Sequence, residues 1–168
     1  MIQNVLSAYY GEIYGIAFFN HYLSNYARSE QPLLWQTLME VEELTAEKLK
    51  PVLLANDMDI ENRHQEVLDK GLADATKWIG LPWQELVATL LKWVEPYEVK
   101  YREWYEEVKT SQQYSITQRE AIELIADHET AIYHCWQQYH AGASGLPALD
   151  AFLKKYRKRE QGPLYTCG

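Results

Sequence analysis

Apolar residues recur every three or four positions along four long segments of the chain, and short runs rich in turn-forming residues separate these segments. This is the spacing of one face of an α-helix, and it predicts helices over about residues 2–27, 32–56 and 82–110. The fourth long helix is expected to begin at Ser115 or Thr117 and to end near residue 141. Four amphipathic helices predict an all-α protein whose apolar faces meet in one core.

Two shorter helices complete the predicted fold, over residues 61–79 and from Pro147 to about residue 159. The first two long helices are joined tightly, as are the last two, so each pair is expected to be antiparallel. About 25 residues separate the two pairs, enough for a crossover helix along the bundle. The sequence therefore predicts a four-helix bundle with a crossover helix and a short C-terminal helix. One domain is expected over residues 1–160, with a flexible tail over residues 161–168.

Prolines and polar residues mark the predicted helix ends. Pro32 suits the first turn of the second long helix, whereas Pro51 is expected to kink that helix or to end it early. Pro96 lies inside the third long helix and should bend it. The fourth helix has two candidate caps, Ser115 and Thr117, and the segment 117–120 fits a capping box.

Each long helix carries one acidic residue in the middle of its apolar face. These residues are Glu12, Glu42, Glu98 and Glu129. The first two are 30 positions apart and the last two 31, as expected for two similar helical hairpins. A lone buried carboxylate costs several kcal/mol unless it is paired, protonated or bound to a cation. The pattern therefore predicts that the four acids converge around a pair of metal ions, with His128 as a nitrogen ligand.

Several assignments stay open from the residues alone. A small rotation of the third long helix would turn Tyr97 inward and leave Glu98 at the edge, and Glu95 is then the substitute ligand. Each acid also has a structural interpretation, because a buried carboxylate can simply accept a hydrogen bond from a core tyrosine. His128, next to Glu129, fits a metal ligand and a core histidine equally well.

Composition and charge restrict the possible functions. The 168 residues are 47% apolar and 13% aromatic, and the net charge is −8. An acidic surface disfavours nucleic acid, and a basic run near the end is expected to be the solvated end of the last helix. That run comprises Lys154, Lys155, Arg157, Lys158 and Arg159. No apolar run approaches membrane-spanning length and two cysteines make no disulfide framework, so a cytoplasmic protein without a membrane partner is expected.

Three motifs resemble the ferritin-like superfamily, in particular an uncharacterised branch of it. They are GEIYGIAFF, LMEVEELTAEKL and LIADHETAIYHCW. The resemblance covers the four long helices and matches Glu12, Glu42, His128 and Glu129, whereas Glu98 is placed only by its apolar face. It implies a four-helix bundle with a long crossover that often houses two iron or manganese ions. The chain departs from the Glu-x-x-His motif of such sites, because Thr45 and Ile132 stand three residues after Glu42 and Glu129.

These features together suggest a dinuclear iron or manganese protein, an oxidoreductase that activates oxygen or peroxide, with an unknown substrate. Tyr9, Tyr97 and Tyr101 are candidates to donate a hydrogen bond or an electron at such a centre. The alternative is a metal-free bundle that acts as a dimeric interaction module, since tyrosine and tryptophan are common at interfaces. A homodimer is expected in either case.

A third hypothesis concerns Cys135. Cys135 and Tyr139 lie one helical turn apart, which is similar to the nucleophile-bearing helix of thiaminase-type all-α enzymes. A thiolate at that position would attack a ring carbon of the substrate. The hypothesis requires a carboxylate that lowers the barrier to this attack.

Overall fold

The computed structural model describes residues 1–26 and 31–158, and the expected tail over residues 161–168 lies outside them. Helices are the regular secondary structure throughout these ranges, so the all-α prediction is confirmed. The six helices are α1 (Ile2–Asn25), α2 (Pro32–Leu54), α3 (His64–Trp78), α4 (Trp83–Val108), α5 (Ile116–His140) and α6 (Leu146–Lys158). None of the described helices combines the length and apolar character needed to cross a membrane.

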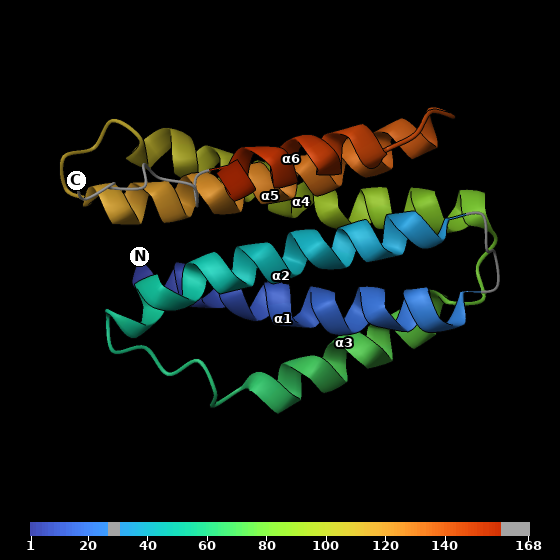
Figure 1. Ribbon diagram of the computed structural model, residues 1–168, viewed down its shortest axis with the longest axis horizontal. Helices are drawn as coiled ribbons and strands as arrows, with labels where there is room; N and C mark the ends of the chain where they lie inside the picture. The colour runs from blue at the N-terminus through green and yellow to red at the C-terminus, as the bar shows by residue number, and fades with distance from the viewer. Residues whose placement is uncertain (27–30, 159–168) are drawn as a thin grey trace, which may run out of the picture.

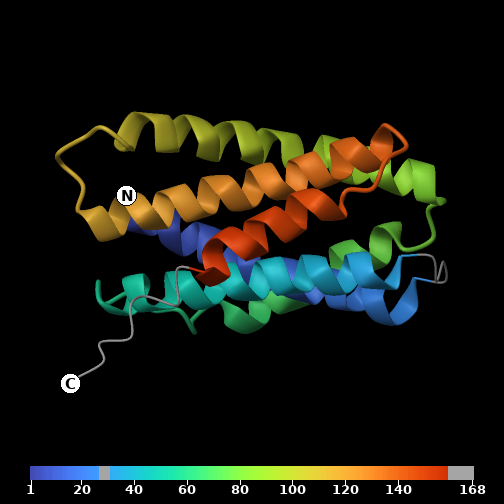
Figure 2. The same cartoon turned by 45° about the horizontal axis from the view of Figure 1, so that its top comes forward.

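The helices form two antiparallel pairs with two additional helices alongside (Figure 1). One pair is α1 with α2, and the other is α4 with α5. α3 packs along α1 and returns the chain to the end of the molecule where α2 begins. α4 therefore begins at that same end. α6 lies against both α2 and α5, across the line where the two pairs meet (Figure 2). The main contacts between the pairs therefore involve α2, α5 and α6, whereas α1 and α4 are less closely packed.

A glycine allows α3 to approach α1 closely. A Cβ atom at Gly71 would lie 2.5 Å from the carbonyl oxygen of Tyr14, so only glycine fits this contact. Two tyrosines of α1 reinforce it. Tyr14 donates a hydrogen bond of 2.7 Å to Asp74, and Tyr22 donates one of 3.3 Å to the carbonyl oxygen of Ala75.

The helix ends differ in detail from the sequence prediction. α2 ends at Leu54, three residues after Pro51, in agreement with an early end. α4 continues through Pro96 to Val108. The capping box of α5 is formed by Ser115 and Gln118 and not by segment 117–120. The side chain of Ser115 accepts a hydrogen bond from the backbone N–H of Gln118, and the side chain of Gln118 accepts one from the backbone N–H of Ser115.

The basic run on α6 was expected to be a solvated helix end, and the structure shows more specific roles. Lys155 forms ion pairs with Asp127, at 2.6 Å, and with Glu123, at 3.3 Å, on α5. Arg157 pairs with Glu40 on α2 at 2.8 Å. These cations therefore connect α6 to both helices beneath it.

Candidate metal centre

Three buried side chains from three helices converge inside the molecule. Glu12 on α1, Glu42 on α2 and His128 on α5 each offer a ligand atom, and these atoms lie within 4.8 Å of one another. Their exposed fractions are only 3%, 6% and 3%. The structure therefore brings together three of the five residues predicted from the sequence, and we call them the carboxylate–histidine cluster.

Thr45 fixes the orientation of the imidazole in this cluster. The Thr45 hydroxyl donates to the carbonyl oxygen of Val41 at 2.8 Å, so it accepts from Nδ1 of His128 at 3.1 Å. The opposite ring nitrogen, Nε2, faces Oε1 of Glu42 at 3.5 Å. A histidine that donates one N–H to a protein acceptor presents its other nitrogen to a metal. Thr45 stands where the Glu-x-x-His motif would place a second histidine, and here it supports the single one.

Oε2 of Glu12 is a buried oxygen with no hydrogen-bond partner in the described structure. It lies 2.9 Å from Nδ1 of His128, with which it forms an ion pair when the imidazole is protonated. Buried polar atoms without a partner are rare, and an absent ion is one of the physical explanations. The donor set of two carboxylates and one imidazole therefore fits a divalent cation.

The electrostatics of the cluster show that it needs a counter-charge. Burial raises the pKa of Glu12 well above its ordinary value, and the nearby Glu42 carboxylate raises it further. Burial alone would lower the pKa of His128, but the charges of Glu12 and Glu42 dominate and raise it well above its usual range. Both shifts favour binding of a proton at the cluster, so a bound cation would compete with that proton.

Gly15 leaves the space that the Glu42 carboxylate occupies. A Cβ atom at this position would lie 2.5 Å from Cδ of Glu42 and 2.6 Å from its Oε2. The carboxylate of α2 thus rests directly on the backbone of α1, one turn after Glu12. This contact gives a physical reason for the glycine three residues after the glutamate in the first helix.

Glu129 lines the same pocket as the cluster but does not belong to the tight group. Its side chain is half-buried. Burial raises the pKa of Glu129 to about 7, with the charges of Glu42 and Glu98 adding to the effect and His128 opposing it. This carboxylate is therefore close enough to the cluster to sense its charges.

Neither acidic candidate of α4 joins the cluster. Glu98 is partly buried, accepts a hydrogen bond of 3.0 Å from Thr130 and lies 3.9 Å from Nε of Arg102. Glu95 is exposed and accepts from Tyr133 at 3.4 Å. Glu98 is thus the more inward of the two, but its carboxylate is engaged with α5 and with its own helix.

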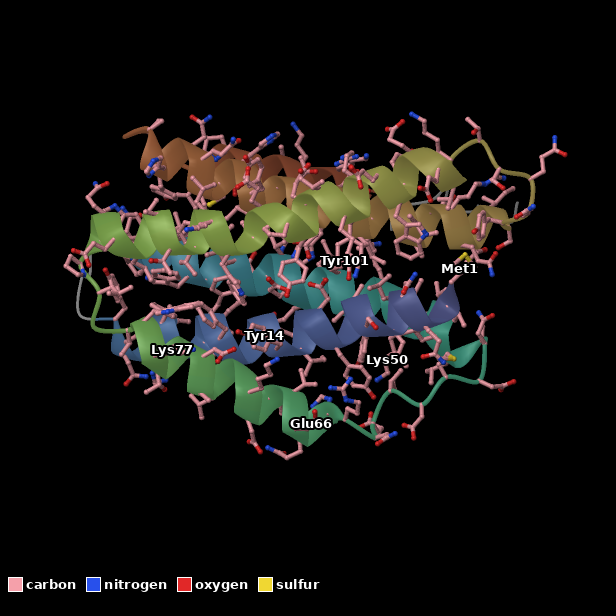
Figure 3. The ribbon with its side chains drawn as sticks, turned by 180° about the vertical axis from the view of Figure 1, so that it is seen from behind. Met1, Tyr14, Lys50, Glu66, Lys77 and Tyr101 are labelled. Carbon is pink, nitrogen blue, oxygen red and sulfur yellow. The ribbon has the colours of Figure 1, made fainter. Side chains whose placement is uncertain are left out.

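The buried polar side chain that α4 contributes at this depth is Tyr101, three residues after Glu98. Tyr101 is 6% exposed, and its pKa is raised by burial and then by the charges of Glu129 and Glu12. Figure 3 shows Tyr101 between α4 and α1. Of the other candidate tyrosines, Tyr97 is 46% exposed, and the pKa of the buried Tyr9 is raised mainly by burial and then by Glu61.

Ile125 on α5 lies three residues before His128, and the two are 1% and 3% exposed. A Glu-x-x-His pair that ended at His128 would therefore have its glutamate at position 125, where this chain has an apolar residue. Ile132, three residues after Glu129, is also buried, at 3% exposed.

Cys135 is not an activated nucleophile. Its side chain is fully buried, and burial raises the pKa of the thiol. A Cβ atom at Gly145 would lie 2.7 Å from its Sγ atom, so the following loop packs directly on the sulfur. A thiaminase-type reaction would need the opposite environment.

Comparisons with protein-family models, curated proteins and solved structures found no match for this chain. The resemblance to the ferritin-like superfamily thus stays a prediction that depends on the motifs around Glu12, Glu42 and His128. The arrangement of these three residues is what a functional proposal has to explain.

Proposed function

We propose that the protein is a ferritin-like metal–carboxylate protein, a four-helix bundle with α3 as its crossover, that binds iron or manganese and activates oxygen or peroxide. The observation that supports it most directly is the carboxylate–histidine cluster, in which two buried carboxylates and one imidazole converge. Two carboxylates balance the charge of one divalent ion. Carboxylate oxygens with an imidazole suit iron or manganese, whereas thiolate ligands, typical of zinc sites, do not take part.

The tight group supplies ligands for one ion. A second ion, as in a dinuclear centre, would draw on Glu129, which lines the same pocket with a pKa raised to about 7. Glu98 would have to leave Thr130 to take part. We therefore propose Glu12, Glu42 and His128 as the primary ligands, and Glu129 as the carboxylate available to a second ion.

When bound, a redox-active ion would supply electrons to oxygen or peroxide. The chain's own residues have other tasks. Thr45 holds the His128 ring, Gly15 leaves room for Glu42, and the Tyr101 phenol lies in the pocket wall, where it can donate a hydrogen bond. The surrounding helices exclude bulk water from the three ligands, each of which is less than a tenth exposed.

Metal analysis after anaerobic loading with Fe²⁺ or Mn²⁺ tests the proposal. We expect at least one ion per chain, or two if the centre is dinuclear. Glu42→Gln should reduce the bound metal at least about tenfold, because it removes a charged ligand. Glu43→Gln is the matched control, since Glu43 is the exposed neighbour on the same helix. Loading below a tenth of an ion per chain in the wild type would contradict the proposal.

The second candidate function is a metal-free interaction module that forms a dimer. It is favoured by the raised pKa of His128, because a protonated imidazole between two carboxylates is itself a counter-charge. α4 also exposes apolar side chains, with Tyr97 and Val99 each 46% exposed. Light scattering coupled to size exclusion distinguishes the two when it is combined with the loading experiment. A dimer that contains no metal, and that Val99→Lys dissociates, would support the module.

A further inference from the structure

A pocket of about 390 Å³ leads to the carboxylate–histidine cluster. Its lining comes from α1, α2, α3, α4 and α5 and includes Arg63, the residue that precedes α3. Figure 3 shows this side of the molecule, with α4, α1 and α3 in front and with Tyr14 and Tyr101 on the two helices that face each other. The volume lies within the range of small-molecule sites, so the pocket has room for more than a metal ion and its water.

The two ends of the pocket carry different ionisable groups. At its deep end the lining comprises the carboxyl groups of Glu12, Glu42 and Glu129 together with the imidazole of His128. The exposed lining residues include three cations, although the chain as a whole carries a net charge of −8. These cations are Arg63, Lys70 and Lys100. The deep end therefore attracts a cation, and the mouth attracts an anion.

The two lysines are the better candidates for anion recognition, and we call Lys70 on α3 and Lys100 on α4 the mouth lysines. Arg63 already pairs with Glu66 at 3.0 Å. Lys100 lies over the ring of Tyr101 with its Nζ 5.2 Å from the centroid, which holds its charge at the pocket wall.

The lining also includes apolar side chains. They are Phe18, Trp93, Val94 and Ile132. Asp74 is a lining carboxylate outside the deep end, and it already accepts the hydrogen bond from Tyr14. A ligand complementary to this pocket has one negative group and an apolar body.

We infer that the pocket binds a small amphipathic carboxylate, whose charged group lies between the mouth lysines and whose apolar body points along Phe18 and Trp93 toward the cluster. This inference rests on the proposed function in one respect: the apolar end of the ligand would lie next to the proposed metal. A small amphipathic carboxylate would then be the substrate of the proposed centre. Recognition at the mouth itself does not require the metal.

Octanoate is the probe, and isothermal titration into metal-free and Mn²⁺-loaded protein measures its binding. We expect one saturable site in both forms. The double variant Lys70→Ala/Lys100→Ala should weaken binding at least about tenfold, because it removes both charged partners. Lys92→Ala is the matched control, since Lys92 is an exposed lysine of α4 outside the pocket lining and its loss should leave the affinity unchanged.

A blocking variant tests the location independently of charge. Gly11 is an exposed residue of the pocket lining, and a Cβ atom there would meet no other atom within 4 Å, so Gly11→Leu adds a large side chain to the lining with no clash at its Cβ. Leucine also favours a helix more than glycine does, so the fold should be retained, as a thermal melt would confirm. We expect octanoate binding to fall at least about tenfold in this variant.

Three results would overturn the inference. They are no saturable binding of octanoate, equal binding of 1-octanol or octylamine, and full octanoate affinity in both the lysine and the Gly11 variants. Failure of Mn²⁺ to bind would instead contradict the proposed metal centre. The octanoate titration of the metal-free protein then still decides the ligand class of the pocket, so the two failures are distinguishable.

Discussion

At the scale of single residues, the position of the Glu42 carboxylate depends on the absence of a Cβ atom at Gly15. Glu42 approaches the backbone of α1 because residue 15 has no side chain, and a Cβ there would lie 2.5 Å from Cδ of Glu42. The space between two packed helices is thereby filled by a ligand and not by a methyl group. The position of the carboxylate is consequently sensitive to the smallest possible substitution.

Gly15→Ala should displace the Glu42 carboxylate and reduce metal affinity at least about tenfold, because ligand geometry is lost. The clash should also offset the gain of up to about 1 kcal/mol that alanine brings to a helix, and leave the variant less stable than the wild type. Gly11→Ala is the control on the same helix, where the added methyl meets nothing within 4 Å. It should stabilise the protein and leave metal affinity unchanged. Urea unfolding and Mn²⁺ titration measure both effects.

Thr45→Val tests the support of His128. The variant keeps the size of the side chain but removes the acceptor for Nδ1, which lies 3.1 Å from the hydroxyl. We expect metal affinity to fall about tenfold or more, as for other losses of an outer hydrogen bond to a ligand histidine. Thr45→Ser should restore most of the affinity because it keeps the hydroxyl. Wild-type affinity in Thr45→Val would show that the ring is oriented by its carboxylate neighbours alone.

At the scale of helices, one carboxylate of α5 accepts two polar contacts from α6. Asp127 accepts hydrogen bonds from Tyr156, at 2.7 Å, and Lys155, at 2.6 Å, and it lies 3.4 Å from Nη2 of Arg102. Burial would raise the pKa of Asp127, but these donors outweigh it and lower the pKa below its usual value. A single side chain thus links α4, α5 and α6.

Asp127→Asn should destabilise the protein by about 1–3 kcal/mol at pH 7, the cost expected for hydrogen bonds to a charged group. Because the pKa of Asp127 is lowered on folding, its contribution is present above the unfolded pKa of about 3.9 and is lost as pH falls through the folded value. Urea unfolding at pH 7 and at pH 3 should therefore show the difference between variant and wild type shrinking in acid. Asp150→Asn, at an exposed position on α6, should change stability little at either pH.

The elements were more predictable from the sequence than the register of their side chains. Apolar spacing was sufficient to predict the helices and to place Glu12 and Glu42 inward, because each helix has one dominant buried face. The sequence allowed two rotations of α4, with either Glu98 or Tyr97 inward; in the structure Tyr97 is exposed and Glu98 is only partly buried. His128 and Glu129 are adjacent on α5, so spacing alone did not separate the buried one from the half-buried one.

At the scale of the whole molecule, the candidate centre connects the two helix pairs. Glu12 and Glu42 come from the first pair and His128 from the second, and the direct packing between the pairs is mainly that of α2, α5 and α6. The pocket arises where α1 and α4 remain apart. It follows from how the helices are assembled, and therefore no local sequence pattern predicted it.

Metal binding should stabilise the whole bundle, since one ion would connect three helices. At an Mn²⁺ concentration 100 times Kd the expected gain is about 2.7 kcal/mol, or roughly 5–10 °C in Tm. The gain should grow from pH 6 to pH 8. Because the pKa of His128 is raised on folding, protonation of His128 stabilises the metal-free fold fully below the unfolded pKa, and this stabilisation is lost as pH rises through the folded pKa. The metal competes with protons for the same ligands, so it binds more strongly as pH rises. Scanning calorimetry with and without Mn²⁺ measures the difference, and a constant gain would contradict proton displacement.

Ile125 and Thr45 make the protein a suitable host for rebuilding a fuller ligand set by design. In the ferritin-like centre that we propose, a Glu-x-x-His pair ending at His128 would have its glutamate at position 125, and one beginning at Glu42 would have its histidine at position 45. Both residues are almost completely buried. Introducing Glu at position 125, His at position 45, and then both would create a stepwise series in a single scaffold. Such a series would show how much each added donor contributes to capturing a second ion.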